Sequence, residues 1–477
     1  MLWRHPIDAS AEDVAVATSF DSPGARVIAL GTNTAPGRVH FLAAPLEEDA
    51  LESPSFSPPP VCGGARSPSN VFALDAPPAS LPSGFGAVRS AAAHPDGYLA
   101  FGTDDRPGVV FPGGLLSPGP PLALEPGEDV LASAAAVHAS GGTGVDASSP
   151  PPAFVFVTWT TPSRAIKLAV DREESRSTLR RVASRTMPAG IDRVRVAAAD
   201  PRPGADFVFV ATDQSPAVIA KIRASDLTVA DAFIVPTELG GFIRAGTMTA
   251  TDESLEEGAA MSFWVTRGNP ATAFALHHAP EREGELAPGS TMRLTASIAL
   301  DATSETRAES LGIDESPGRS RMYVGFAGDA ADPTATSRAA SFFYRGTSLG
   351  PGNREGTLER AGGTVDIPGT RALLFARAND GVSTWITRAS PAEIVAADHD
   401  RDADDDARVL AAAGPPSEAF PSGDAFVCVA FVNETHVGAW RQRVPPEAVD
   451  TREKREAFRE ALNAASDAGG GVSVKAC

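Results

Sequence analysis

The stretch "FVFVATDQSPAVIAKIRASDLTVADAFIV", residues 207–235, decides the fold of this chain. It contains three runs of large apolar and β-branched residues of the kind that form buried strands: "FVFVAT", "VIAKIRA" and "TVADAFIV". "DQSPA" separates the first two runs and predicts a turn, because Pro216 sets φ and removes a backbone donor. A fourth strand is expected just upstream, in "DRVRVAAAD" at 192–200. The stretch therefore predicts four short antiparallel strands connected by tight turns.

The same outline returns along most of the chain. Seven further segments each place two strand-like runs on either side of a turn, and they begin at Arg26, Gly97, Ala153, Met261, Arg321, Arg371 and Ala425. The turn prolines Pro162, Pro216 and Pro270 are spaced 54 residues apart, and so are Lys167 and Lys221. A period of this length without a helical segment indicates a radial or linear array of β units.

We expect the array to close on itself. A four-stranded unit cannot bury both of its faces alone, whereas units arranged radially cover each other's sheets and leave only short edges. The sequence therefore predicts an all-β fold, a β-propeller of seven or eight blades. A β-helix fits less well because its coils are shorter and more regular.

Two groups of repeats resemble these units. The unit at 207–235 is similar to the blades of YVTN and NHL propellers. The segments "LGTNTAPGRV", "FGTDDRPGVV" and "LEPGEDVLASAAAV" resemble tandem repeats of large proteins of unicellular eukaryotes, in which a "GT-x-x-x-PG" turn joins two strands. The resemblance covers residues 26–444 and implies a propeller. It implies no chemistry, because propellers serve as enzymes, scaffolds and receptors.

Two regions differ from the repeat. Residues 46–86 are rich in Pro, Ser and Gly, which predicts a disordered insertion within a propeller domain spanning 1–445. Residues 446–477 predict a C-terminal helix and tail, with Asp450 as the N-cap, Glu453 at the capping-box position and glycines from Gly469 as the stop. We expect this helix to pack on the rim of the propeller or to begin a connection to another module.

The formal net charge of −19 argues against a nucleic-acid partner and against an anionic membrane surface. No stretch approaches the roughly 20 apolar residues that a membrane-spanning helix needs, and no signal-peptide pattern is visible. The cysteines Cys62, Cys428 and Cys477 do not make a disulfide framework. Either all three are free thiols, or Cys62 and Cys428 pair between the first and last units of the ring.

An acidic loop, "DHDRDADDDARV" at 398–409, is the candidate metal site. Its carboxylates stand at positions 1, 3, 5 and 9 of a spacing that can turn oxygens toward one calcium ion: Asp398, Asp400, Asp402 and Asp406. The flanking segments resemble the FG-GAP blades of integrin-type propellers. The loop departs from that family at Ala403, where Gly would make the sharp turn. The alternative is an acidic loop exposed to solvent.

Other candidate site residues are scattered. "GTSLG" at 346–350 matches a nucleophile elbow around Ser348, but a loop-like "PGN" follows where a helix is required. His277 and His278 are adjacent, so on a strand they point to opposite faces. If the protein is an enzyme, catalytic residues facing the central channel would come from several blades, and they include Asp192, Asp213, Asp226 and His94. Trp385 and Trp440, which share a similar repeat position 55 residues apart, are candidates for stacking on sugar or peptide, or for packing between blades.

We therefore expect a non-enzymatic recognition propeller, one part of a surface or extracellular assembly, that binds protein or glycan through its loops. The alternative is a propeller enzyme of lyase or hydrolase type with its site at the central channel. The sequence predicts no cofactor other than calcium. A single glycosylation sequon, "NET" at Asn433, matters only for a secreted chain.

Overall fold

The computed structural model describes most of the repeat region and short parts of the remainder. The described residues are 3–6, 14–22, 25–32, 34–45, 73–74, 79–80, 83, 85–94, 98–104, 108–113, 119–136, 153–173, 176–200, 205–249, 260–268, 271–278, 291–300, 308–314, 320–326, 337–350, 353–360, 365–367, 373–379, 382–387, 393–398, 425–432, 437–444 and 473–476. Apart from a 3₁₀ turn at Thr237–Leu239, every regular element among these residues is a strand, so the fold class is all-β.

The stretch at 207–235 folds as predicted. It supplies β16 (Phe207–Thr212), β17 (Val218–Arg223) and β18 (Val229–Ile234), and the upstream segment supplies β15 (Val194–Ala199). The four strands pair antiparallel in chain order. The two middle strands are buried on both faces, which explains why their sequence is an almost continuous apolar run rather than an alternation.

Three other sheets have the same four-stranded order. Their strands are β7 (Val88–Ala93), β8 (Leu99–Thr103), β9 (Val109–Gly113) and β10 (Leu122–Ala123); β11 (Val130–Ala136), β12 (Ala153–Thr158), β13 (Arg164–Glu173) and β14 (Arg176–Thr186); and β19 (Phe242–Thr249), β20 (Ala260–Arg267), β21 (Thr272–His278) and β22 (Met292–Ala299).

Two sheets elaborate this plan. The first contains β2 (Val14–Ser22), β3 (Ala25–Thr32), β4 (Arg38–Pro45), β5 (Ala73–Leu74) and β6 (Ala79–Ser80). Both β5 and β6 pair with β4, so the end of the predicted insertion at 46–86 adds to a sheet. The second contains β23 (Ala308–Asp314), β24 (Ser320–Phe326), β25 (Ser337–Gly350), β26 (Asn353–Arg360), β27 (Val365–Ile367), β28 (Leu373–Asn379), β29 (Val382–Thr387), β30 (Glu393–Asp398) and β1 (Trp3–Pro6).

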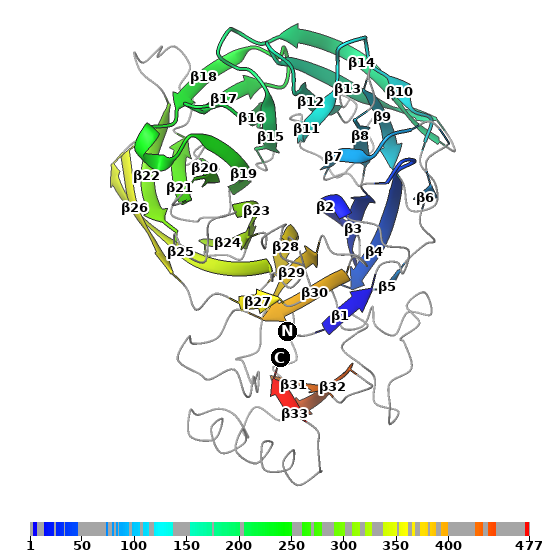
Figure 1. Ribbon diagram of the computed structural model, residues 1–477, viewed down its shortest axis with the longest axis vertical. Coiled ribbons are helices and arrows are strands. Elements are labelled where there is room, and N and C mark those ends of the chain that lie inside the picture. The colour runs from blue at the N-terminus through cyan, green and yellow to red at the C-terminus, as the bar shows by residue number, and fades with distance from the viewer. Residues whose placement is uncertain are drawn as a thin grey trace.

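The sheets are arranged radially around a common centre, as Figure 1 shows. Their innermost strands contact one another in a closed cycle: β2, β7, β11, β15, β19, β23, β28 and back to β2. The N-terminal strand β1 pairs antiparallel with β30, so a strand from the start of the chain completes the group formed by β28, β29 and β30. This closure leaves no open gap in the ring, and the fold is a β-propeller.

The core lies between neighbouring sheets rather than at the centre of the ring. For example, Val155 and Ala165 of one sheet pack with Val208, Val210 and Ala220 of the next. Large aromatic side chains fill the equivalent spaces elsewhere, and those with less than 2% exposure include Phe101, Phe154, Phe156, Phe209, Phe263, Trp264 and Phe274. Among the described residues, the sheets β7–β10, β11–β14, β15–β18 and β19–β22 each bury both faces against their neighbours, as expected for a ring of stacked units.

Two of the eight predicted units differ from the expectation. In the unit beginning at Arg371, β28 is the innermost strand, whereas the corresponding run in the other units is the second strand. The unit beginning at Ala425 forms β31 (Ala425–Val432) and β32 (Val437–Val444), which join β33 (Ser473–Ala476) in a separate three-stranded sheet. Figure 1 draws this sheet outside the ring. The helix predicted from Asp450 to Gly469 lies outside the described residues.

Candidate interaction surface

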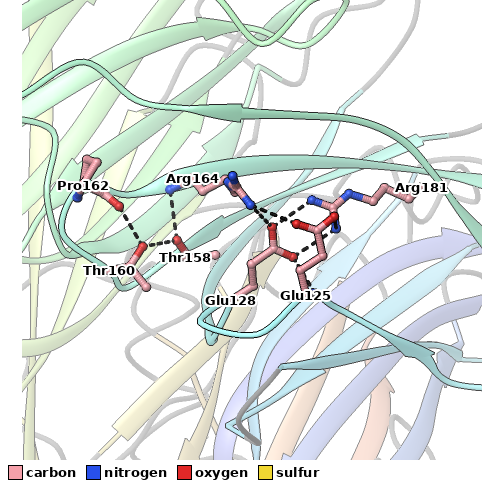
Figure 2. Close-up of polar contacts among 7 residues, drawn as sticks. All are labelled: Glu125, Glu128, Thr158, Thr160, Pro162, Arg164 and Arg181. Carbon is pink, nitrogen blue, oxygen red and sulfur yellow. Dashed lines mark hydrogen bonds and ion pairs between the residues drawn. The ribbon is translucent and has the colours of Figure 1, made fainter.

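A threonine-centred turn repeats at one end of the sheets, where their second strands finish; this side of the ring is called the turn-bearing edge. The second strand of each sheet ends there, opposite the start of the innermost strand, as in the pairs Val130↔Thr158 and Val194↔Thr212. In four turns the threonine hydroxyl accepts a hydrogen bond from the backbone N–H six residues later, at 2.8–3.0 Å: Thr32 from Arg38, Thr158 from Arg164, Thr212 from Val218 and Thr266 from Thr272. This contact closes the turn and sets the start of the third strand (Figure 2).

A second threonine reinforces two of these turns. The Thr160 hydroxyl lies 2.6 Å from that of Thr158 and donates to the Pro162 carbonyl at 2.8 Å. Thr34 makes the equivalent pair of contacts with Thr32 and the Pro36 carbonyl. No role was expected for the turn threonines from the sequence, although a regular spacing marks them: Thr32, Thr158, Thr212 and Thr266 stand four residues before Pro36, Pro162, Pro216 and Pro270.

The same turns hold the segments that connect successive sheets. The backbone N–H of Arg193 donates to the Thr160 carbonyl at 2.9 Å, and the Arg193 carbonyl accepts from Asp213 at 2.9 Å. The Gln214 amide donates to the Gly190 carbonyl at 2.7 Å. The connecting segment that contains Gly190 and Arg193 is therefore held between two turns.

An exposed indole stands on this surface. Trp159, directly after Thr158, has 41% of its area exposed. The Arg193 guanidinium lies over the Trp159 ring, 5.6 Å from its centroid. Arg193 has φ +50°, in the left-handed region that a non-glycine residue seldom occupies, and its two backbone hydrogen bonds hold it there. These contacts fix the backbone position from which the Arg193 side chain reaches over the indole.

A cluster of charges joins two neighbouring sheets beside these turns (Figure 2). Glu128, in the segment between β10 and β11, has a side chain only 3% exposed. It accepts hydrogen bonds from Arg181 of β14 at 2.8 and 3.1 Å and from Arg164 of β13 at 2.9 Å. Glu125 lies at the exposed side of the cluster and contacts both arginines.

The Glu128 carboxyl is ionised because of these partners. Burial raises the pKa of Glu128, but hydrogen bonds from Arg181, from the Glu125 backbone and from Arg164 outweigh it and hold the pKa below its ordinary value. The hydrogen bond to Glu128 also raises the pKa of Arg164. Glu128 accordingly acts as a charged clamp between the sheet β7–β10 and the sheet β11–β14.

Three further ion pairs involve a bulged position near the start of the innermost strands. The β-bulges lie between Val88 and Ser90, between Val194 and Val196, and between Ile243 and Ala245. The residue within each bulge is an arginine, and the pairs are Arg89–Asp104 at 2.8 Å, Arg195–Asp213 at 3.6 Å and Arg244–Glu309 at 3.2 Å. A bulge directs a side chain away from the regular alternation, and here it directs a guanidinium toward a carboxylate.

The two lysines that share a repeat position are both buried. Lys167 donates to the Ser225 carbonyl at 3.4 Å, and Lys221 lies 3.9 Å from the centroid of the Phe207 ring. Burial lowers the pKa of Lys167, although the nearby Asp206 and Asp226 oppose the shift. These lysines lie between sheets, away from the turn-bearing edge.

The acidic loop predicted to bind calcium is described only at its first residue. Asp398 is the last residue of β30 and pairs with Val382. Asp400, Asp402 and Asp406 lie outside the described residues, so the calcium site stays a prediction. Among the residues that the structure describes, no group of three or more His, Cys, Asp or Glu side chains is placed to hold a metal ion.

The residues predicted for a channel enzyme are dispersed. Asp213 pairs with Arg195 at the turn-bearing edge, and Asp192 lies in a connecting segment at the same edge. Asp226 occupies the β17–β18 turn, where hydrogen bonds from the Thr228 hydroxyl and backbone lower its pKa. His94 is buried against Phe154, with ring centroids 6.2 Å apart. The structure does not bring these four residues together.

Ser348 lies in a pair of antiparallel strands, and both His277 and His278 are buried. Ser348 lies within β25 opposite Arg354 of β26, a continuous hairpin rather than a strand-to-helix elbow. His278 is buried, and its Nε2 lies 2.6 Å from the Ser262 hydroxyl, which also accepts from the Trp264 indole at 2.7 Å. His277 is also buried.

The two candidate tryptophans and the cysteines lie in different parts of the fold or outside the described residues. Trp385 lies in β29, an inner strand of its sheet, whereas Trp440 lies in β32, at the edge of the separate three-stranded sheet. They therefore do not occupy equivalent positions. Cys428 lies in β31, and Cys62 and Cys477 fall outside the described residues. Within the described ranges no helix has the length and apolarity to cross a bilayer.

No protein-family model and no curated protein matches the chain. Solved structures are similar to it, among them the β-propeller domain of Cps50 (Swd1) from Myceliophteria thermophila, at 10% identity over 81% of this chain and 99% of that one, with a TM-score of 0.45. Sqt1 from Saccharomyces cerevisiae is 10% identical over 83% and 99%, with a TM-score of 0.45. BBS1N, solved in complex with ARL6DN, is 9% identical over 84% and 96%, with a TM-score of 0.46. Because these scores are below 0.5, the propeller assignment rests on the strand order and the closed cycle of contacts.

Proposed function

We propose that this chain is a non-enzymatic, seven-bladed recognition propeller that binds a protein partner at its turn-bearing edge. The observation that carries the proposal is the exposed Trp159 ring on that edge, with the Arg193 guanidinium over it. Seven blades are supported by the seven innermost strands of the contact cycle, with β1 pairing into the last group of strands.

A rigid exposed tryptophan favours recognition on physical grounds. Tryptophan and arginine dominate the binding energy of many protein interfaces, because each buries a large contact area and loses little conformational freedom when it is already ordered. Here the backbone of Arg193 is fixed by Thr160 and Asp213 before any partner arrives. The partner therefore meets a preorganised aromatic and guanidinium pair.

The charged groups of the same edge support a binding role. Asp213, Asp104 and Glu128 each pair with an arginine, so their charges are compensated within the protein. An edge built in this way is stable and specific in shape. It suits a scaffold that presents a surface to other proteins.

We further propose that the propeller works as one part of a larger assembly at the cell surface or outside the cell. The acidic loop that begins at Asp398 would hold calcium there. A sugar ring could also stack on the Trp159 indole. We favour a protein partner because the Arg193 guanidinium over the indole adds hydrogen-bond donors for the carbonyls and carboxylates of a polypeptide.

The test compares the parent chain with a Trp159→Ala variant in affinity purification from the native source, followed by direct binding of each recovered partner. Ile234→Ala is the matched control, since Ile234 is also exposed but lies on an outer strand. We expect Trp159→Ala to lose the partner and Ile234→Ala to keep it. Equal recovery with both variants contradicts the proposal, and binding of a glycan with loss on Trp159→Ala replaces the protein partner with a sugar.

A further inference from the structure

A second surface, distinct from the turn-bearing edge, lies at the outer rim of the sheet β11–β14. β14 is the last strand of that sheet and pairs only with β13 in the described sheets. It is 11 residues long, compared with six for β18 and eight for β22 and β26. Figure 1 shows it along the outside of the ring. A strand in this position presents unpaired backbone donors and acceptors to its surroundings.

This rim is basic in a chain that is strongly acidic. β13 and β14 together contain seven arginines and lysines and two carboxylic acids, whereas the chain has a net charge of −19. Lys167 is buried and both Arg164 and Arg181 pair with Glu128. The remaining basic residues of the hairpin are Arg172, Arg176, Arg180 and Arg185. The neighbouring hairpin, β17 and β18, contains only Lys221, Arg223 and Asp231 as charged residues. The positive charge is therefore concentrated on one outer hairpin.

Two of the β14 arginines are available at the surface. Arg180 has a side chain 57% exposed, and its partner is the exposed Asp171 of β13, at 2.9 Å. Such an exposed pair contributes little to stability and can exchange for another carboxylate. Arg185 is also exposed, and Val182 between them is exposed at a β-bulge. Arg181, by contrast, points to Glu128 and fixes β14 to the preceding sheet.

We propose that β14 accepts an extended, acidic segment of a partner protein as an added fifth strand. The free backbone edge supplies the hydrogen bonds of strand addition. The exposed arginines select the partner, because carboxylates on alternate residues of an added strand add charge pairs with them, whereas a neutral strand adds none and a basic strand is repelled. The bulge at Val182 and the arginines also keep β14 from pairing with strands of other kinds.

The experiment uses the full chain and three labelled peptides of about eight residues, since that length matches a strand. The first peptide alternates Glu and Val. The second alternates Glu and Pro, with the same charge but without the backbone donors that a ladder needs. The third alternates Lys and Val. Fluorescence anisotropy gives the Kd of each, and hydrogen exchange reports protection of the β14 amides.

We expect the Glu–Val peptide to bind, with protection of β14 amides, and the other two to bind at least about tenfold more weakly, since each lacks one of the two interactions. The double variant Arg180→Gln/Arg185→Gln should weaken Glu–Val binding about tenfold, because two charge pairs are lost. The matched control is Arg345→Gln, whose side chain is 73% exposed and pairs with Glu359 on another part of the rim.

Any of the following outcomes overturns the proposal. The first is equal binding of the Glu–Pro and Glu–Val peptides, which would reduce the surface to a charged patch. The second is an equal loss in the Arg345→Gln control. The third is binding without protection of β14 amides, or no binding of the Glu–Val peptide. Each of these results is independent of the Trp159 surface, so it does not affect the proposed function.

Discussion

The Arg181 guanidinium on β14 donates two hydrogen bonds, at 3.1 and 2.8 Å, to the buried carboxylate of Glu128. Glu128 lies 53 residues earlier in the chain, in the segment that connects the preceding sheet to β11. Arg164 donates to the same carboxylate, so one buried acid holds two strands of the neighbouring sheet (Figure 2). Because its partners hold the pKa of Glu128 below the ordinary value, folding and ionisation of this carboxyl are linked.

The first prediction concerns Glu128→Gln. Removing the charge leaves Arg164 and Arg181 without their carboxylate. We expect the free energy of unfolding at pH 7 to fall by about 2–3 kcal/mol. This loss is smaller than for a fully buried ion pair because both arginines are partly exposed. The pKa of Glu128 is lower in the folded state. Its stabilisation is therefore present at neutral pH and lost as the pH falls below about 5.

Urea unfolding at pH 7 and at acidic pH checks this prediction. The difference between parent and Glu128→Gln should shrink as the pH falls. Glu125→Gln is the control, since the Glu125 side chain is 61% exposed and its loss should cost about 0.5 kcal/mol or less. A Glu128→Gln effect that is small at pH 7, or that does not change with pH, contradicts the clamp.

The second prediction concerns the turn threonine of the stretch at 207–235. Thr212→Val keeps the shape of the side chain but removes the acceptor of the Val218 N–H, 2.8 Å away. We expect the free energy of unfolding to fall by about 1–2 kcal/mol, because a buried backbone donor loses its partner. Thr158→Val should have a similar effect through Arg164.

The control for the turn threonines is Thr186→Val at the exposed end of β14, for which a change within about 0.5 kcal/mol is expected. Chemical denaturation of the four proteins supplies the comparison. If Thr212→Val and Thr186→Val are equally stable, the hydroxyl contact is not what closes the turn.

The third prediction concerns the packing of Gly246 in β19. A Cβ built on Gly246 meets the ring of the fully buried Trp264, so there is no room for a side chain. Gly246→Ala should destabilise the protein by about 1–3 kcal/mol through overpacking. In a Trp264→Leu background the space is present, and the additional loss caused by Gly246→Ala should be at least about 1 kcal/mol smaller. Additive losses in this double-mutant cycle would show that the two residues do not share one space.

The fourth prediction concerns calcium. Thermal melts in millimolar calcium and in EDTA should differ for the parent, because binding to the folded state at about 100 times Kd adds roughly 2.7 kcal/mol of stability. Asp400→Ala removes a carboxylate of the loop at 398–409 and should abolish the difference. If the melting curves of the parent protein in calcium and in EDTA superimpose, the acidic loop is exposed to solvent and binds no calcium.

The strands of this protein are determined locally. Continuous apolar runs such as Phe207–Thr212, which end at turn residues, form strands wherever they occur, because β-branched and aromatic side chains fill a sheet that is covered on both faces. This information lies within a few residues of each strand. It was sufficient to predict the four strands from 194 to 234 and the radial array.

Only the tertiary structure decided how the array closes and what its edge presents. The pairing of Trp3 with Ala396 joins the two ends of the ring, and no local pattern in β1 names β30 as its partner. The contacts of Glu128 with Arg164 and Arg181, and of Trp159 with Arg193, depend on which faces meet once the sheets are stacked. Strand formation depends on neighbouring residues, whereas charge pairing and surface exposure depend on residues brought together by ring closure, so the sequence alone could predict the first and not the second.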